Sequence, residues 1–530
     1  MDSDEADDLT LVSRVALACL GPQGSVQGVQ ANPRCDVGTL SSNSRRLFES
    51  IKLKTWLARA LVRLAVQPQV EAFGDGGLLA AAIAATLVEA VNASARSPLD
   101  RFHATRSLDG LLDGLRSRLK VDLALEIDGV EGAVRPIREL DWSDMGSLVA
   151  LARGVVSSKQ KLSTTSEEVD HVCTTLAKAF VLALPESASF KEPHIGLVTI
   201  TGPSASETFA TSNIVLDIPI SHQTERMLPI AWPTILVFNN GLDVDLERNE
   251  QQIDGVPAEA GGVRLEYQGD ELRSQGEAKM SMELSFLSDL VRRLAADKIS
   301  VVACQKTIHP FIKQELAFYG IVPIERVSLR HIDAVADCCG ARPISTLAGG
   351  AASLRMQAGA LKRISVRRLR TKPVIILEPA EDRSMQTVVL TAPNEFIMEE
   401  LAACCRSVFS LFTAALRSPF VIPGGGCLEL ILSRLVRIGA AASPPKTRED
   451  HVVSNILERF AKTLEDIGLS LSRGHLGLGS GETASQRLAG LFKTYGSSEV
   501  LDLVLAKLAA IEFAIEAACT LSRVDCTLVA

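Results

Sequence analysis

The sequence predicts a multi-domain protein of α and α/β class. At 530 residues the chain is too long for a single hydrophobic core and should divide into roughly three or four domains. Apolar residues make up 47% of the chain, which is enough to fill those cores. Both ends show helical periodicity, whereas the middle alternates strands with helices. The order of segment types, helical, mixed, α/β, mixed and helical, is nearly symmetric. It indicates nested domains, of which the outer ones are each built from two separate segments of the chain.

The first 140 residues are predicted to be mostly helical. The run Leu78 to Val91 is apolar nearly all round, as expected for a helix buried among other helices. The longest apolar stretch, Gly76 to Val91, is only about 16 residues long and is interrupted by Glu89, so it is short for a membrane span. A second apolar face has helical spacing and comprises Leu53, Leu57, Leu61, Leu64 and Ala65. We therefore expect a helix-bundle core and no membrane span.

The middle of the chain changes character from about residue 141. A mixed region contains a helix at 169–184 and a β-branched strand at 195–200. From about residue 212, strands at 214–216, 234–238, 299–303 and 321–324 alternate with helices near 284–294, from about 309, and ending near 340. Such alternation is typical of an α/β layer with parallel strands.

The segment 241–280 is polar and glycine-rich, and is expected to be an exposed excursion from this layer. Its stretch Asp243 to Glu247 superficially resembles a calcium loop. Arg248 stands where such a loop requires glycine for its sharp turn, so calcium binding is not expected.

The last third of the chain returns to helices. Strands are predicted at 374–377 and 388–390, and helical periodicity resumes from about residue 396. Two further helices, at 500–509 and 511–524, are apolar with few interruptions and are expected to be buried.

Composition excludes several functional classes. The net charge is −8 and aromatic residues make up only 4%, so nucleic-acid binding is not expected. Acidic residues at the N-terminus oppose a secretory or mitochondrial signal, which predicts a cytosolic protein. None of the eleven cysteines lies in a C-x-x-C arrangement, so buried free thiols are expected. No G-x-S-x-G or H-E-x-x-H motif supports an unrelated hydrolase.

Two glycine turns, far apart in sequence, carry the strongest functional signal. Gly74, Asp75 and Gly76 precede the alanine-rich helix, and Gly424, Gly425 and Gly426 precede another apolar run. Glycines let backbone N–H groups approach an anion, a following helix N-terminus adds positive potential, and the Asp75 carboxylate could hold Mg²⁺. Each turn alone more often marks a plain helix start. Together they predict a phosphate pocket assembled from both ends of the chain.

These turns, with the nested organisation, resemble the group II chaperonin family, which includes TRiC/CCT subunits and the thermosome. Leu20-Gly21-Pro22-Gln23-Gly24 corresponds to the family's first phosphate-contacting loop, and Val421 to Gly426 to its nucleotide-base turn. Cys304-Gln305-Lys306 corresponds to a strand end in the apical domain. The stretches Cys304 to Pro310 and Gly424 to Glu429 resemble the divergent branch of McKusick-Kaufman/Bardet-Biedl chaperonin-like proteins.

The resemblance implies a chaperonin fold with a helical equatorial domain, a small mixed intermediate domain and an α/β apical domain. The implied boundaries are equatorial 1–140 and 404–530, intermediate 141–211 and 370–403, and apical 212–369. It also implies ATP with Mg²⁺ as ligand, Asp75 as the metal ligand, and a vestigial nucleotide site. The implied site residues are Gly21, Pro22, Gly24, Gly74, Asp75, Gly76, Gly424, Gly425 and Gly426.

Departures from the family pattern argue against ATP hydrolysis. The family has two hydrolytic aspartates, and their positions are occupied by Ser44 and Ser407. Serine hydroxyls cannot act as carboxylate bases, and losing a general base typically costs about 10² to 10⁴-fold in rate. Leu78 follows Gly76-Gly77 where the family has threonines, and 474–481 has no ribose-binding aspartate. We therefore expect no catalytic residue and weak or absent nucleotide binding.

The family's apical lid is also in doubt, because the corresponding stretch, about 251–283, contains five glycines that discourage long helices. The branch resemblance implies assistance in assembling the BBSome, a ciliary trafficking coat, with other Bardet-Biedl chaperonin-like proteins and TRiC/CCT subunits. It implies a location in the cytoplasm and at the centrosome or ciliary basal body. The alternative is an ATP-hydrolysing protein-folding chaperonin subunit.

Overall fold

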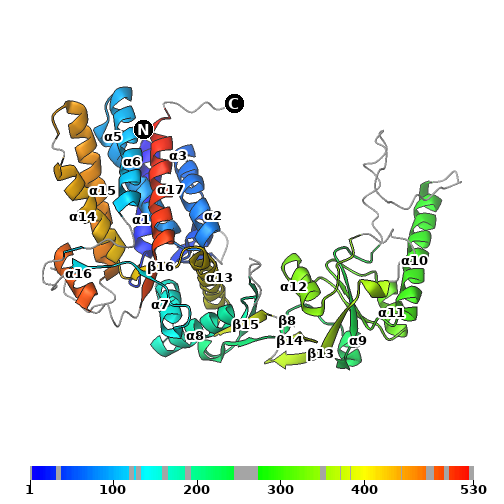
Figure 1. Cartoon of the computed structure of the whole chain (residues 1–530). Helices are drawn as coiled ribbons and strands as arrows, with labels where there is room; N and C mark the ends of the chain where they lie inside the picture. Colours follow the sequence, from blue (N-terminus) through cyan, green and yellow to red (C-terminus); the bar gives the residue numbers. More distant parts are fainter. Residues whose placement is uncertain are drawn as a thin grey trace. The chain divides into compact units, whose positions relative to one another are not determined.

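The computed structural model describes residues 3–30, 38–118, 125–126, 133–157, 165–185, 193–243, 272–345, 354–370, 372–381, 384–442, 445–472, 483–493 and 500–524. These residues form two compact units (Figure 1). Unit 1 comprises Met1–Lys178, Thr201–Thr208 and Leu390–Ala530, and unit 2 comprises Ala179–Ile200 and Phe209–Val389. The three-domain division expected from the sequence remains a prediction.

Unit 1 is mainly helical and is built from both ends of the chain. Its helices are α1 (Ser3–Cys19), α2 (Ser44–Ser50), α3 (Trp56–Leu61), α4 (Gln67–Phe73), α5 (Gly77–Ser94), α6 (Pro98–Arg118), α7 (Met145–Val156), α8 (Ser166–Leu182), α13 (Glu395–Arg417), α14 (Cys427–Ala442), α15 (Arg448–Ser472), α16 (Ala484–Lys493) and α17 (Val504–Ser522). Its short strands are β1 (Gln27–Val29), β2 (Thr39–Ser41), β3 (Leu125–Glu126), β4 (Ala133–Val134), β5 (Arg138–Glu139), β16 (Phe420–Pro423) and β17 (Leu501–Leu503).

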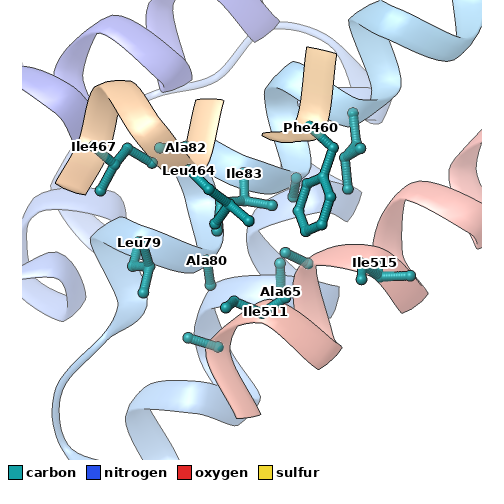
Figure 2. Packing of buried hydrophobic residues seen from close by; sticks show 14 of the residues in the cluster. Ala65, Leu79, Ala80, Ala82, Ile83, Phe460, Leu464, Ile467, Ile511 and Ile515 are labelled. Atoms are coloured by element: carbon teal, nitrogen blue, oxygen red, sulfur yellow. The ribbon is translucent and has the colours of Figure 1, made fainter. Parts of the chain in front are cut away.

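Helix α5 forms the centre of unit 1 and packs against α1, α15 and α17. Its alanines allow neighbouring helices to approach closely, and its larger side chains fill the space between them. Figure 2 shows Leu79 and Ile83 of α5 among Phe460 and Leu464 of α15 and Ile511 of α17. Burying one such large side chain is worth about 1.5–3 kcal/mol. The core therefore requires the two ends of the chain to fold together.

By length and composition, α5 is the single described helix that could cross a membrane, and 72% of its apolar window is buried inside the protein. Such a helix is weak evidence for a span, because a buried core helix has the same composition.

Two predictions for unit 1 were wrong in detail. Leu57, Leu61 and Ala65 are buried as expected, but Leu64 is 39% exposed. A π-helical turn, Val62–Val66, joins α3 to α4 and rotates the apolar face by adding a residue to the turn. The two helices predicted at 500–509 and 511–524 are one helix, α17, preceded by β17.

Strand β16 joins distant parts of unit 1. It pairs antiparallel with β17 and with β5, so Val421 lies opposite both Leu503 and Arg138. This three-stranded sheet leads directly into the 424–426 turn and fixes that turn beside β17.

Unit 2 has the α/β character predicted for the middle of the chain. Its helices are α9 (His222–Met227), α10 (Leu272–Ala296), α11 (Pro310–Phe318) and α12 (Leu329–Cys339). Its strands are β6 (His194–Thr201), β7 (Phe209–Thr211), β8 (Ile214–Leu216), β9 (Ile230–Ala231), β10 (Thr234–Phe238), β11 (Val301–Cys304), β12 (Val322–Ile324), β13 (Gly359–Leu369), β14 (Lys372–Pro379) and β15 (Met385–Ala392).

The main sheet of unit 2 has the order β12-β11-β10-β13-β14-β8, with β9 also paired to β13. Strands β10, β11 and β12 are parallel, as the alternation predicts. Strands β13, β14, β8 and β9 pair antiparallel, and β13 was not predicted. Helix α10 begins at Leu272 and includes Gly276, so the predicted excursion to residue 280 is too long. Its remainder, 244–271, lies outside the described residues.

The multi-domain α and α/β fold class is confirmed. Nine cysteines in the described part of the chain are buried and free, also as predicted.

Candidate functional site

The first wall of the candidate site is the loop that follows α1. Gly21 has a φ of +79°, and its carbonyl accepts a hydrogen bond from the Gly24 N–H at 2.9 Å. A side chain at Gly24 would lie 2.4 Å from the Cys19 carbonyl oxygen, so only glycine fits this tight turn.

The second wall is the turn between α4 and α5. Gly74 ends α4 in the left-handed region (φ +72°), and Gly76 precedes α5 with φ +83°. The buried amide of Gln69 donates to the Asp75 carbonyl at 2.8 Å and to the Ala506 carbonyl at 2.9 Å. Gln69 therefore ties the turn that carries Asp75 to helix α17.

The third wall is the turn before α14. The Gly424 N–H donates to the Val500 carbonyl at 3.0 Å, and Gly425 and Gly426 have φ values of +73° and +86°. A side chain at Gly426 would lie 2.4 Å from the Gly468 carbonyl oxygen of α15. This turn is therefore held against both β17 and α15.

These three turns line one cavity of about 90 Å³. Five of the residues predicted for the site line it, namely Gly21, Pro22, Asp75, Gly76 and Gly425. Gly24, Gly74, Gly424 and Gly426 belong to the same turns but are not lining residues; they shape the backbone behind the cavity. The structure thus brings together the two distant glycine turns and the loop after α1.

Sequence reasoning missed the residues that complete the lining. They lie in α1, α5, α7, α15, β17 and α17 or directly next to these elements, and are Cys19, Leu20, Leu78, Leu79, Gly154, Ser157, Leu471, Val500, Asp502 and Lys507. Lys507 is the single cation in the apolar stretch 500–515, and this isolated charge was the signal that could have identified it.

The main charges of the site form a buried network around Lys507. Its ammonium lies 2.6 Å from Glu429 Oε1 and 3.3 Å from Asp502 Oδ2, and the Glu429 side chain is fully buried. Burial opposes the charged form of Lys507, but Asp502 and Glu429 outweigh it and raise the pKa of Lys507. Burial raises the pKa of Asp502, and Lys507 offsets part of that effect. Because carboxylates already surround Lys507, its charge is largely neutralised.

Ser44 and Ser407, the serines predicted from the sequence to occupy the two acidic positions, both contact the turn that carries Asp75. The Ser407 hydroxyl donates to the Gly74 carbonyl at 2.6 Å and is almost fully buried. A side chain at Gly77 would lie 2.6 Å from Ser44 Oγ, which shows how closely Ser44 packs on the same turn. Ser407 therefore acts as a neutral hydrogen-bonding group and Ser44 as a neutral packing group in this structure.

The buried acid Glu400 does not replace them. Its carboxylate accepts hydrogen bonds from the Ser41 hydroxyl and from the N–H and hydroxyl of Ser42, each at 2.8 Å. It also lies 3.6 Å from the Arg46 guanidinium. Glu400 does not line the cavity, and these contacts hold its carboxylate against the segment before α2. The stretch 474–481, where no ribose ligand was found in the sequence, lies outside the described residues.

The chain is similar to chaperonins over nearly its whole length. Residues 12–530 match the TCP-1/cpn60 chaperonin family. The human protein "Molecular chaperone MKKS" is 26% identical over 476 residues, which cover 87% of this chain and 76% of the human protein. "Thermosome subunit 3" of Haloferax volcanii is 24% identical over 537 residues, covering 97% of this chain and 92% of that subunit. "Thermosome subunit alpha" of Saccharolobus solfataricus is 24% identical over 459 residues, which cover 86% of this chain and 75% of that subunit. The chain belongs to the TCP-1/cpn60 chaperonin family.

Proposed function

We propose that this chaperonin-like protein has a degenerate ATPase site and acts by binding partners rather than by an ATP-driven cycle. The observation that carries the proposal is the placement of Ser44 and Ser407 against the Gly74–Gly77 turn. Hydrolysis needs a group that orients or deprotonates water, together with neutralisation of the phosphate charge. Two hydroxyl groups that are packed against this turn do not supply such a base.

Nucleotide binding is proposed to be weak or absent. The turns around Asp75 fit the phosphate end of Mg²⁺-ATP, with Asp75 as the residue that would hold the metal. The cavity of about 90 Å³ is much smaller than a pocket for a whole ligand, which is about 300–1,000 Å³. Leu78 lines the cavity and offers no hydroxyl to a phosphate. These features favour a vestigial site.

We propose that the protein assists assembly of the BBSome together with other Bardet-Biedl chaperonin-like proteins and TRiC/CCT subunits. It would act in the cytoplasm and at the centrosome or basal body. Support comes from similarity to the protein named "Molecular chaperone MKKS" and from the serines at the acidic positions. In this proposal the chain keeps the equatorial, intermediate and apical division with the boundaries given above.

Affinity isolation of the full chain from ciliated cells, followed by mass spectrometry, tests the partner proposal. The expected result is enrichment of TRiC/CCT and BBSome subunits over a matched isolation of an unrelated tagged protein. Recovery of neither set would overturn it. An Asp75→Ala variant should recover the same partners, because the proposed association does not use nucleotide.

The alternative is an ATP-hydrolysing folding chaperonin. It is favoured by the preserved cradle, in which three turns, Asp75 and Lys507 converge. Phosphate release from ATP that falls strongly in Asp75→Ala would support this alternative. Equal release by both proteins would point to a contaminating ATPase.

A further inference from the structure

Positive charge is concentrated in one stretch of unit 2. Residues 359–377 contain six cations and no acidic residue, although the whole chain has a net charge of −8. The cations are Lys362, Arg363, Arg367, Arg368, Arg370 and Lys372. Most of this stretch forms β13, which lies inside the main sheet between β10 and β14. Strands β13 and β14 are labelled in Figure 1. Its cations are therefore presented from the face of a sheet and not from a mobile tail.

The two faces of β13 differ in chemistry. Ile364 and Val366 pack into the core cluster that includes residues of α12. Because neighbouring side chains on a strand point to opposite faces, Arg363 and Arg367 lie on the other face. Both are exposed. Arg363 and Arg367 are four residues apart, which corresponds to roughly 13 Å along the strand. A β-bulge between Leu361 and Arg363 interrupts the alternation, so the exposed Lys362 lies beside Arg363 and not on the core face.

Two cations of this stretch already bind carboxylates of the same chain. The Arg368 guanidinium lies 3.2 Å from Glu225, and the Lys372 ammonium lies 2.6 Å from Asp217. Within the described part of the chain, Lys362, Arg363 and Arg367 form no ion pair. Glu378 lies opposite Arg363 in the strand register, but the two are not joined by an ion pair. Carboxylate-binding groups thus remain available on β13.

An exposed tryptophan lies at the edge of this charged area. Trp232 follows β9, and its backbone N–H donates to the Lys362 carbonyl at 2.9 Å. Its side chain is 68% exposed, and its φ is +54°, a rare conformation for a bulky residue. A strained residue that presents a large aromatic side chain to solvent is typical of a functional surface. Tryptophan and arginine are also the residues most enriched at energetic centres of protein interfaces.

We propose that Lys362, Arg363, Arg367 and Trp232, here called the basic face, bind an extended acidic segment of a partner protein. The planar guanidinium can pair with carboxylates in a two-pronged geometry. Two neighbouring cations of the same stretch, Arg368 and Lys372, already form single-contact ion pairs with carboxylates. The fixed spacing of Arg363 and Arg367 on a rigid strand matches carboxylates at positions i and i+4 of an extended peptide. A membrane surface fits less well, since a single indole is the apolar element of the basic face.

The test is binding of a fluorescein-labelled, glutamate-rich peptide to the full chain, followed by anisotropy. A peptide of about 12 residues covers the strand at about 3.4 Å per residue. We expect Arg363→Ala combined with Arg367→Ala to weaken binding about tenfold, and Trp232→Ala to weaken it several-fold. Binding should also fall between about 0.05 and 0.3 M salt, as the Debye length shortens.

The matched control is Arg63→Ala combined with Arg459→Ala, which removes the same charge from exposed arginines of unit 1. This control should bind the peptide like the parent protein. Equal weakening by both pairs would show a general charge effect and overturn the proposal. Arg363→Lys combined with Arg367→Lys retains the charge, and its affinity for the peptide should fall only a few-fold. This variant therefore separates a loss of binding groups from a loss of folding.

Anionic phosphatidylserine vesicles provide the remaining test. The proposal is refuted if the peptide does not bind at low salt. It is also refuted if the basic-face variants lose vesicle binding while peptide binding is unchanged. The expected result is that the basic-face variants lose peptide binding. The parent protein should bind vesicles no more strongly than the Arg63→Ala, Arg459→Ala control does.

Discussion

Replacing Lys507 with methionine should strongly destabilise unit 1. Lys507 lies 2.6 Å from Glu429 and 3.3 Å from Asp502, and the Glu429 side chain has no exposed surface. Among the described residues, the second oxygen of Glu429 has no hydrogen-bond partner even with Lys507 present. Removing one partner of a buried ion pair leaves an uncompensated charge and costs about 3–5 kcal/mol. We expect a loss of that size in the free energy of unfolding.

The chain offers a clean assay for this loss. Of its three tryptophans, Trp56 and Trp142 lie in unit 1 and Trp232 in unit 2. In a Trp232→Phe background, indole emission during urea unfolding therefore reports on unit 1 alone. Lys462→Met, at an exposed cation of α15, is the control and should change stability by no more than about 0.5 kcal/mol.

A second substitution tests the electrostatic reasoning itself. Adding Glu429→Gln to Lys507→Met removes the unpaired charge and should recover about 1–3 kcal/mol. The reasoning is refuted if Lys507→Met costs less than the Lys462→Met control, or if Glu429→Gln adds its own loss instead of recovering stability.

Two further predictions concern acid stability and the glycine turns. Burial opposes ionisation of Asp8, but hydrogen bonds from Thr55 outweigh it and hold the Asp8 pKa below its ordinary value of 3.8. The stabilising contribution of Asp8 is therefore present above pH 3.8 and is lost as the pH falls below that value. Urea unfolding curves of Asp8→Asn and the parent should differ at pH 6 and converge in acid. A difference that grows in acid would contradict this reasoning. Gly426→Ala should lower the thermal unfolding temperature, because its φ is +86° and a side chain would meet the Gly468 carbonyl at 2.4 Å. Gly114→Ala, in helix α6 with open space around it, should be neutral or raise that temperature, and similar losses from both alanines would contradict the strain argument.

The fold class and the cradle could be predicted because their signals are local. The alanine-rich run of α5 is apolar on all sides, which specifies a buried helix whatever surrounds it. Glycines with positive φ, such as Gly76 and Gly426, mark turns that other residues rarely adopt. The resemblance then indicated which turns meet.

The missed features depend on contacts that a linear pattern does not contain. The role of Lys507 depends on Glu429 of α14 and Asp502 of β17, which only the folded unit brings within reach. Strand β13 lacks a regular alternation of apolar and polar residues, because a β-bulge between Leu361 and Arg363 interrupts its period. The exposure of Leu64 follows from a π-turn, whose extra residue shifts the helical period without a distinct sequence signal.

Phosphate release from ATP by the purified full chain tests the central claim most directly. The claim is that both ends of the chain build the cradle and that Ser44 and Ser407 leave it without a water-activating acid. We predict that the parent protein releases phosphate no faster than its Asp75→Ala variant. Release that exceeds the variant by about 100-fold, as a functioning general base would provide, would contradict the account.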